Sequence, residues 1–320
     1  MINSSNLFKV TAAIALVGSF AGAANAATPT LYANGITSPA GTVEIGGKQW
    51  VSDHLQGFCR LDVPATGGTA AINASTCVTI AGSAGQATFD ANRNLLYLPD
   101  NSSKSQGVWR LQYNPTRGVM ITSTTSTNRP ILVARQGANR PTATALAENG
   151  DLLIGFTRTG AIMRVTNPHR TPGTAVRVGR TSTGGGVAGF TMLGSTLYIA
   201  EDAAVSSIPT RPAQLTACGS PCIASPLVSS FISGPTGITS DQTSLYISDV
   251  ANEVIKYTPA ADPDLGTDTE EIFVPGGFLR LISGLGINSA KDTLYVGSDP
   301  TDGNGIAQGF LHQVALPVTP

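Results

Sequence analysis

The fold of this chain is decided by the stretch Gly-Pro-Thr-Gly-Ile (234–238), Leu-Tyr-Ile-Ser-Asp (245–249) and Val-Ile-Lys-Tyr (254–257). This sequence pattern occurs six times in the chain, although several copies are imperfect. In the quoted copy an apolar pair, Leu245-Tyr246, opens the second segment. The second residue of this pair marks each copy: Trp50, Tyr97, Leu153, Tyr198, Tyr246 and Tyr295. A fixed repeat length of roughly 20–50 residues indicates one supersecondary unit copied around a ring or along a solenoid.

Each copy predicts a first strand, a hairpin turn, and then a second and a third strand. Glycine, asparagine and aspartate supply the backbone angles of the turn. A small residue two positions into the first strand fits a strand crowded against its equivalents around a central channel. The first strands are predicted to begin at the leading residues Pro39, Gln86, Pro141, Val187, Pro235 and Gly284. The small residues two positions later are Gly41, Thr88, Ala143, Gly189, Gly237 and Gly286.

A fourth strand is expected in every copy except the last, near 78–80, 131–134, 175–178, 227–231 and 272–274. Residues 30–33 precede the first copy and belong to no hairpin within it. We expect residues near 30–34 to lie antiparallel beside residues near 310–316, because this pairing leaves no long strand edge exposed. The predicted fold class is all-β: a six-bladed β-propeller with four antiparallel strands per blade, closed by the N-terminal strand.

The copy at 235–257 resembles the NHL repeat in Pro235-Thr-Gly-Ile, Leu245-Tyr-Ile-Ser-Asp249 and Val254-Ile-Lys256. With six copies, the chain is similar to the NHL and gluconolactonase-like six-bladed propellers, as an exported protein of bacterial type. The resemblance implies a propeller over the whole mature chain. It leaves the function open, because such propellers serve as lactonases, lyases, synthases and binding platforms.

The first 26 residues predict a secretory signal peptide. Lys9 precedes an apolar run over 10–20, and small residues end in Ala24-Asn25-Ala26, which is the order typical of such signals. We expect cleavage after Ala26 and a single propeller domain over 27–320. The protein is expected to be exported, and therefore periplasmic or extracellular.

Four cysteines fit an oxidising destination, where cysteines tend to pair. Cys59 and Cys77 fall on the predicted third and fourth strands of the first copy, and Cys218 and Cys222 close a short surface loop. A zinc or redox site is the competing interpretation, but four convergent ligands and the Cys-x-x-Cys spacing are absent. We therefore predict that all four cysteines form disulfides.

The charge balance argues against two classes of partner. The chain has 19 basic and 20 acidic residues, and charged residues make up only 12% of it. A nucleic-acid binder needs a basic face that neutralises phosphates, and a membrane-surface protein needs a basic or amphipathic segment. We expect no nucleic acid, no membrane insertion, and a monomer.

Acids follow the second strand in most copies, on the face where the first strands begin, which we call the upper face. They are Asp53, Asp100, Glu201, Asp202, Asp249 and Asp299. Together they would suit a divalent cation such as calcium, which favours several oxygen ligands. Alternatively, each acid accepts N–H groups of its own turn, which explains the recurrence without a shared site. We favour the second interpretation and predict no cofactor.

The channel carries no clear enzyme signature. Propellers resembling gluconolactonases hold a divalent ion with a Glu, an Asn and an Asp from separate inner strands, and the ion polarises an ester carbonyl or activates water. Here Glu44, Asp90 and Asn288 lie toward the hairpin turns. Motifs of serine hydrolases, zincins and nucleotide hydrolases are absent. No catalytic residue is predicted.

Two loops, at 101–107 and 299–308, are longer than their equivalents and belong to the copies that flank the first copy in a closed ring. Loops on a rigid scaffold often hold function, although neutral growth is the competing explanation. We predict a module that binds a small molecule, glycan or protein at the upper face; the alternative is a metal-dependent lactonase-like hydrolase or lyase at the channel. The candidate ligand-binding residues are Asp53, His54, Asp100, Arg140, Glu201, Asp249 and Asp299.

Overall fold

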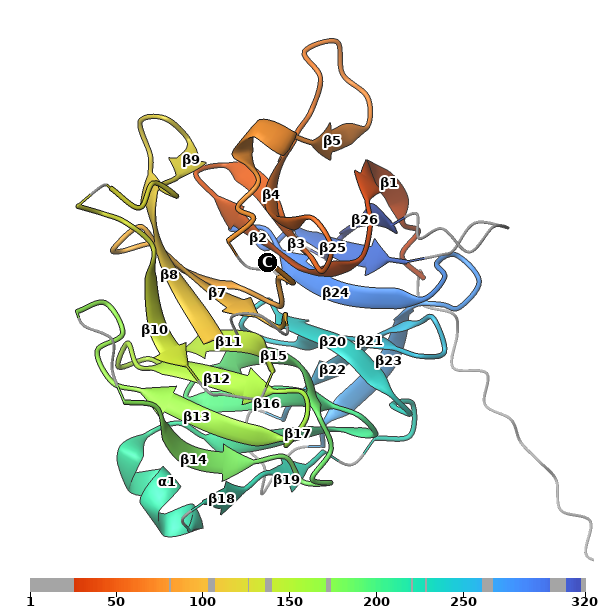
Figure 1. Ribbon diagram of the computed structural model, residues 1–320. Helices are drawn as coiled ribbons and strands as arrows, with labels where there is room; N and C mark the ends of the chain where they lie inside the picture. Colours follow the sequence, from red (N-terminus) through yellow and green to blue (C-terminus); the bar gives the residue numbers. More distant parts are fainter. Residues whose placement is uncertain are drawn as a thin grey trace, which may run out of the picture.

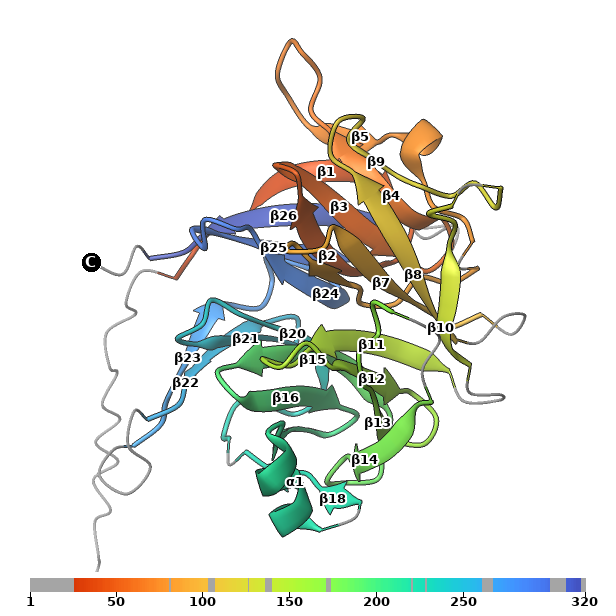
Figure 2. The same ribbon diagram turned by 90° about the vertical axis from the view of Figure 1, so that its left-hand side faces the viewer.

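The computed structural model describes residues 26–317, apart from 81, 103–106, 126, 136–139, 171–173, 220, 228, 261–266 and 300–308. The described part is almost entirely β-structure (Figures 1 and 2). The predicted signal lies outside the described residues except for Ala26. Among the helices of this described part, none has the length and apolar character needed to cross a bilayer.

Four sheets correspond to the second, third, fourth and fifth copies of the repeat (Figure 1). The second contains β6 (Thr88–Asp90), β7 (Leu95–Asp100), β8 (Gly107–Asn114) and β10 (Ile131–Arg135), with β9 (Val119–Met120) added to β8. The third contains β11 (Pro141–Leu146), β12 (Leu152–Phe156), β13 (Ala161–Val165) and β14 (Val176–Arg180), with β18 (Cys222–Ile223) parallel to β14. The fourth contains β15 (Val187–Leu193), β16 (Thr196–Glu201), β17 (Ala204–Pro209) and β19 (Ser225–Pro226), and the fifth contains β20 (Pro235–Ser240), β21 (Leu245–Asp249), β22 (Val254–Thr258) and β23 (Thr269–Val274).

The first and last copies share one eight-stranded sheet. Its order is β2 (Pro39–Ile45), β3 (Lys48–Asp53), β4 (Gly57–Asp62), β5 (Ala70–Ile72), β1 (Thr30–Ile36), β26 (Gly309–Ala315), β25 (Thr293–Ser298) and β24 (Ile282–Ile287). The expected antiparallel pairing of β1 with β26 is present, with Thr30 opposite Gln313 and Leu31 opposite His312. The unexpected link is β5, which pairs with β4 and lies parallel to β1.

Two predicted outer strands were wrong, and one helix was not foreseen. The fourth strand expected at 78–80 is a single bridge between Val78 and Phe58, because β5 occupies the place beside β4. The strand expected at 227–231 is replaced by the shorter β19, which pairs with β17. The repeat also gave no sign of α1 (Pro212–Cys218), which precedes β18 and begins with a proline at its first turn.

The inner strands contact one another in a cycle. β2, β6, β11, β15, β20 and β24 touch in that order, and β24 touches β2. A Cβ atom added at Gly284 would lie 2.1 Å from the backbone of Ala40, and one at Gly237 would lie 2.6 Å from the carbonyl oxygen of Ser283. Neighbouring inner strands therefore pack backbone against backbone, which explains the small residues predicted there.

The structure corrects the position of the small residue in two copies. In the first copy a β-bulge places Pro39 opposite Asp53 and Gly41 opposite Ser52, and copies three, four and five share it. In the second copy Ala84 is opposite Asp100, and in the sixth Ile282 is opposite Ser298. The equivalents of Gly41 are therefore Gln86 and Gly284, in place of the predicted Thr88 and Gly286.

Gln86 is consequently a long side chain at a position that is otherwise glycine or alanine. Its Oε1 accepts a hydrogen bond from the backbone N–H of Phe190 at 2.7 Å, and its Nε2 donates to the carbonyl oxygen of Ile238 at 3.1 Å. A Cβ atom at Gly41 would lie 3.2 Å from Gln86 Cγ. The side chain thus crosses the channel and joins the second copy to the fourth and fifth.

Hydrophobic clusters fill the junctions between consecutive sheets. Trp50 of the first copy packs with Leu96 of the second, and Tyr246 of the fifth packs with Leu294 of the sixth. A further cluster joins the last copy to the first and includes Tyr295 and Val51. The bulky marker residues that revealed the repeat are therefore mostly core residues between sheets.

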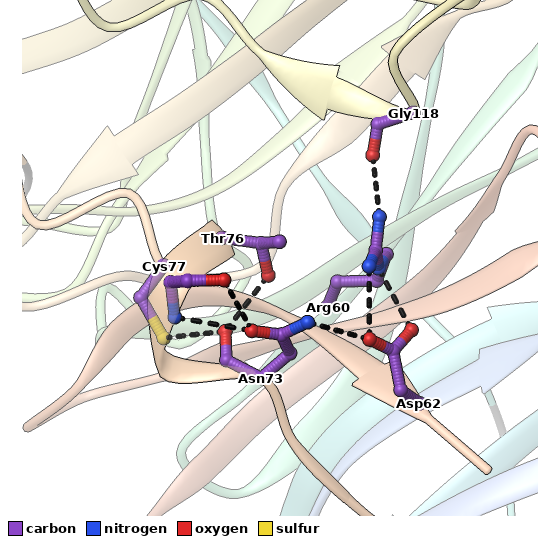
Figure 3. Close-up of polar contacts among 7 residues, drawn as sticks. Arg60, Asp62, Asn73, Thr76, Cys77 and Gly118 are labelled. Atoms are coloured by element: carbon purple, nitrogen blue, oxygen red, sulfur yellow. Dashed lines mark hydrogen bonds and ion pairs between the residues drawn. The ribbon is translucent and has the colours of Figure 1, made fainter. Parts of the chain in front are cut away.

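A polar network holds the outer edge of the first copy (Figure 3), and a disulfide at Cys77 adjoins it. The Arg60 guanidinium binds both carboxylate oxygens of Asp62 at 2.8 Å, which lowers the pKa of Asp62, and donates to the carbonyl oxygen of Gly118 in the second copy. Cys59 is bonded to Cys77, and Cys218 to Cys222. Cross-links of this kind fit an oxidising, exported environment.

Gln86→Ala is expected to lower the free energy of unfolding by about 1–3 kcal/mol, because it removes the partners of the Phe190 N–H and the Ile238 carbonyl. Urea denaturation measures this change. The matched control is Gln214→Ala, since Gln214 is exposed on α1 and should tolerate the loss. Equal stability of the two variants would contradict the role of Gln86 as a cross-channel tie.

Candidate functional site

Most of the upper-face acids bind the loop that leads into the first strand of their own copy. Asp53 is fully buried, and its Oδ2 accepts from the backbone N–H groups of Thr37 and Ser38 at 2.5 and 3.1 Å. Its Oδ1 accepts from the N–H groups of Leu55 and Gln56 at 2.8 and 2.9 Å. These four bonds use both carboxylate oxygens to fix the turns on each side.

Asp249 makes the same arrangement in the fifth copy. It accepts from the N–H groups of Ser233, Gly234 and Ala251 at 2.8–3.0 Å. Burial is the largest influence on Asp249 and would raise its pKa, but the hydrogen bonds outweigh it and the pKa lies below its ordinary value. The carboxylate is therefore charged at neutral pH and committed to the backbone.

Glu201 repeats the arrangement in the fourth copy with a longer side chain. Its two oxygens accept from the N–H and hydroxyl groups of Ser182 and Thr183 at 2.7–3.1 Å. Burial would raise the pKa of Glu201, yet the Ser206 hydroxyl, together with these bonds, brings it below its ordinary value. The adjacent Asp202 accepts from the N–H of Gly186 at 2.8 Å.

These contacts favour the turn-capping interpretation of the acids over a shared cation site. Asp100 likewise accepts from the N–H of Ser102 at 2.9 Å. Within the described ranges, no three His, Cys, Asp or Glu side chains lie close enough together to hold a metal ion. The described acids therefore do not form a ligand set for calcium.

Acidification is expected to unfold the protein partly through Glu201 and Asp249. Their pKa values are depressed, so their stabilising effect is complete above the ordinary values of 4.5 and 3.8 and is lost as the pH falls through the lowered pKa values. Asp249→Asn should therefore reduce stability at pH 7 by about 1–3 kcal/mol and flatten its dependence on pH below about 4. Urea denaturation at pH 7 and pH 3 measures both effects.

The control for that series is Glu148→Gln, an exposed surface acid whose ion pair with Arg211 contributes little. It should leave both the stability and its pH dependence close to those of the wild type. A pH dependence for Asp249→Asn that matches the wild type would show that the buried carboxylate has no such linkage.

Asp299 differs from the other acids because it stands one residue later. Ser298 occupies the position opposite the leading residue of its copy, so Asp299 points away from its own loop. Its Oδ2 accepts from the Ser38 hydroxyl of the first copy at 2.9 Å. Its Oδ1 is buried and has no hydrogen-bond partner within the described part of the chain.

His54 lies in the same network. Its backbone N–H donates to the carbonyl oxygen of Ser38 at 2.9 Å, and its Nδ1 lies 3.2 Å from the hydroxyl of Ser83 in the second copy. Burial lowers the pKa of His54, although Asp53 and Asp299 oppose this effect. The ring is therefore neutral at pH 7, with one nitrogen able to donate and the other able to accept.

Other buried polar atoms near this network also lack partners among the described residues. The backbone N–H of Asn101 donates to the carbonyl oxygen of Ser83, which carries the hydroxyl beside His54. The side-chain oxygen Oδ1 of Asn101 is buried and has no partner among the described residues. The predicted ligand-binding residue Arg140 also has a buried Nε without a described partner, but no described contact joins it to this network. An unpaired buried polar atom is unusual in a protein and calls for an explanation such as a bound ligand or water.

An exposed, strained leucine borders the same group. Leu281 is 57% exposed and has a left-handed backbone with φ of 47°, which is rare for a bulky residue. Its N–H donates to Oδ1 of Asn252, and its carbonyl oxygen accepts from the N–H of Asp299. Leu55, on the turn after His54, is 70% exposed on the same face.

We name the residues Ser38, His54, Ser83, Asn101 and Asp299 the upper-face cluster. The structure links two of the predicted ligand-binding residues, His54 and Asp299, through Ser38, and Asp53 supports them by binding the same loop. Asp100, Glu201 and Asp249 instead serve turns of their own copies. Sequence reasoning missed Ser38, Ser83 and Asn101, because only the meeting of copies six, one and two brings them together.

The central channel holds a cavity of about 450 Å³ below Gln86. Its lining comes from the inner strands and from hairpin turns on the opposite, lower face. Glu44 accepts from the N–H and hydroxyl of Ser289, and Asp90 pairs with Arg93 at 2.9 Å. The sequence placed both acids in turns, but Glu44 lies in β2 and Asp90 ends β6; Glu44 binds a turn of the sixth copy and Asp90 the turn of its own copy. The described lining of the channel contains no carboxylate.

No protein-family model matches the chain, and no curated protein matches it in sequence. Solved structures do match its fold. A gluconolactonase from Xanthomonas campestris has a TM-score of 0.61 at 15% identity, over 91% of this chain and 90% of that chain. A carbohydrate-active enzyme of family AA12 from Trichoderma reesei has a TM-score of 0.60 at 13% identity, over 91% and 96% of the two chains.

Virginiamycin B lyase from Staphylococcus aureus is a third match, with a TM-score of 0.51 at 16% identity, over 91% of this chain and 99% of that chain. At such low identities the likeness concerns the fold alone. The chain therefore has the fold of the gluconolactonase-like β-propellers, a fold that hosts different chemistries.

Proposed function

We propose that this protein is an exported β-propeller module that binds a small molecule at its upper face. The observation that carries the proposal is Asp299 Oδ1, a buried carboxylate oxygen that has no partner among the described residues. Leaving such an atom unpaired costs about 1–3 kcal/mol, more when it is charged. A ligand that donates a hydrogen bond there removes that cost.

The surroundings of Asp299 define the ligand. Neutral His54 offers one donor or acceptor, the Asn101 carbonyl oxygen offers an acceptor, and the exposed side chain of Leu281 offers an apolar contact. A small set of placed polar groups beside an apolar side chain suits a small organic molecule. We therefore favour a small molecule with at least two hydrogen-bond donors over a protein or an extended glycan.

The proposed scaffold is a single domain of six blades, closed by β1 on β26. Two observations support it: the inner strands touch in a cycle, and a hydrophobic cluster containing Ala33, Val51 and Leu311 joins the last copy to the first. Closure matters for function because Asp299 belongs to the sixth copy, while Ser38 and His54 belong to the first. We propose that the module acts as a monomer in the periplasm or outside the cell.

The binding proposal is tested by thermal unfolding in the presence of a library of small metabolites. A true ligand at 100 times its Kd stabilises the native state by about 2.7 kcal/mol, and the double variant Asp299→Asn with His54→Gln should lose that stabilisation. Asp202→Asn is the matched control, because Asp202 is an acid on the same face outside the upper-face cluster. Ligands that stabilise the double variant as strongly as the wild type would place binding elsewhere.

Metal-dependent hydrolysis of lactones is the second candidate function, because a gluconolactonase shares the fold and another match is a calcium structure of the AA12 enzyme. The described residues do not fit a metal site, since backbone N–H groups occupy Asp53, Glu201 and Asp249 and no three His, Cys, Asp or Glu side chains of the described part lie close enough together. We expect no hydrolysis of glucono-δ-lactone above the buffer rate, with or without added calcium, by a pH-stat assay. Turnover that is abolished by a chelator and restored by calcium would favour the enzyme.

A further inference from the structure

The cavity below Gln86 has the size and lining of a second binding site. Its volume of about 450 Å³ falls in the range of roughly 300–1,000 Å³ that is usual for small-molecule sites. Gln86 separates it from the upper face, because both ends of its amide are bound to the opposite side of the channel. None of the residues of the upper-face cluster lines this cavity.

The cavity presents hydroxyl groups that have no assigned role. Thr88, Thr191 and Thr239 lie on the inner strands of three copies and line the cavity, and their hydroxyls bind no other described residue. By contrast, Thr144 in the same lining donates to the carbonyl oxygen of Tyr97. Three copies therefore contribute unused hydrogen-bonding groups to one open cavity.

The mouth of the cavity is bordered by two residues with unusual backbones. Gln242 and Lys291 have φ angles of 81° and 59°, in hairpin turns where glycine or asparagine is usual. Strained positions of this kind concentrate at functional sites. They place an amide and an ammonium group beside the opening, and neither side chain has a partner among the described residues.

Apolar side chains complete the lining. Phe89, Leu146 and Met192 come from three successive inner strands and alternate with the hydroxyl-bearing residues. Lys291 is the one charged side chain in the described lining, and the nearby Glu44 is bound to Ser289. An apolar ligand would leave the threonine hydroxyls unpaired. A multiply charged ligand would find only Lys291 as a charged partner in the described lining.

We propose that this lower cavity binds an uncharged polyhydroxylated molecule of about monosaccharide size. Such a molecule offers hydroxyl groups to Thr88, Thr191 and Thr239, and its C–H faces pack against Phe89. The lower cavity shares no lining residue with the upper-face cluster, so binding there is independent of binding at the upper face.

The test titrates the full mature protein with D-glucose and with myo-inositol, followed by ligand-observed NMR. Saturable binding of at least one probe is expected. The double variant Thr191→Val with Thr239→Val should weaken it at least about tenfold, because two hydrogen bonds are lost while the shape of the side chains is kept. The control Thr30→Val with Thr269→Val changes two exposed strand residues and should leave binding unchanged.

The proposal is overturned if neither probe saturates, or if the Thr191/Thr239 double variant binds like the wild type. It is also overturned if the Asp299→Asn with His54→Gln variant abolishes probe binding, because the probe would then occupy the upper face. Retention of binding by that variant supports the lower cavity and leaves the upper-face proposal to its own assay.

Discussion

The structure depends on the contact of inner strands through their backbones around the central channel. At the narrowest level even a methyl group does not fit at Gly284, where an added Cβ atom would lie 2.1 Å from the backbone of Ala40. Five copies have glycine or alanine at the position of Gly41. The second copy has Gln86 there, and its side chain crosses the central channel. The constraint removes most chemistry from the middle of the channel and leaves the two ends for function.

The acids of the upper face illustrate how structural demand limits function. A loop that leads into a buried inner strand has N–H groups that need acceptors, and Asp53, Glu201 and Asp249 supply them. Asp299 does not bind the loop of its own copy, because Ser298 occupies the position opposite the start of the first strand and Asp299 follows it. Among the described residues its Oδ1 has no hydrogen-bond partner, and its backbone N–H binds the carbonyl oxygen of Leu281.

Much of this fold could be predicted from the sequence, because bulky residues recur at the same interval at which neighbouring sheets pack together. Bulky markers such as Trp50 and Tyr246 recur where sheets meet, and residues 30–33 lacked any local partner, which pointed to β26. The register of copies two and six was missed, because a shared β-bulge is invisible in residue spacing and Gln86 does not look like an equivalent of glycine. His54 and Asp299 were named from the sequence, whereas Ser38 and Ser83 join them only through contacts between copies.

The central claim is that the ring of inner strands closes with Gln86 across the channel and leaves Asp299 Oδ1 available to a ligand. A high-resolution crystal structure of the untreated mature protein tests it most directly. The account predicts that Gln86 binds the Phe190 N–H and that density other than protein contacts Asp299 Oδ1. A channel open from end to end, or a protein side chain bonded to that oxygen, would contradict it.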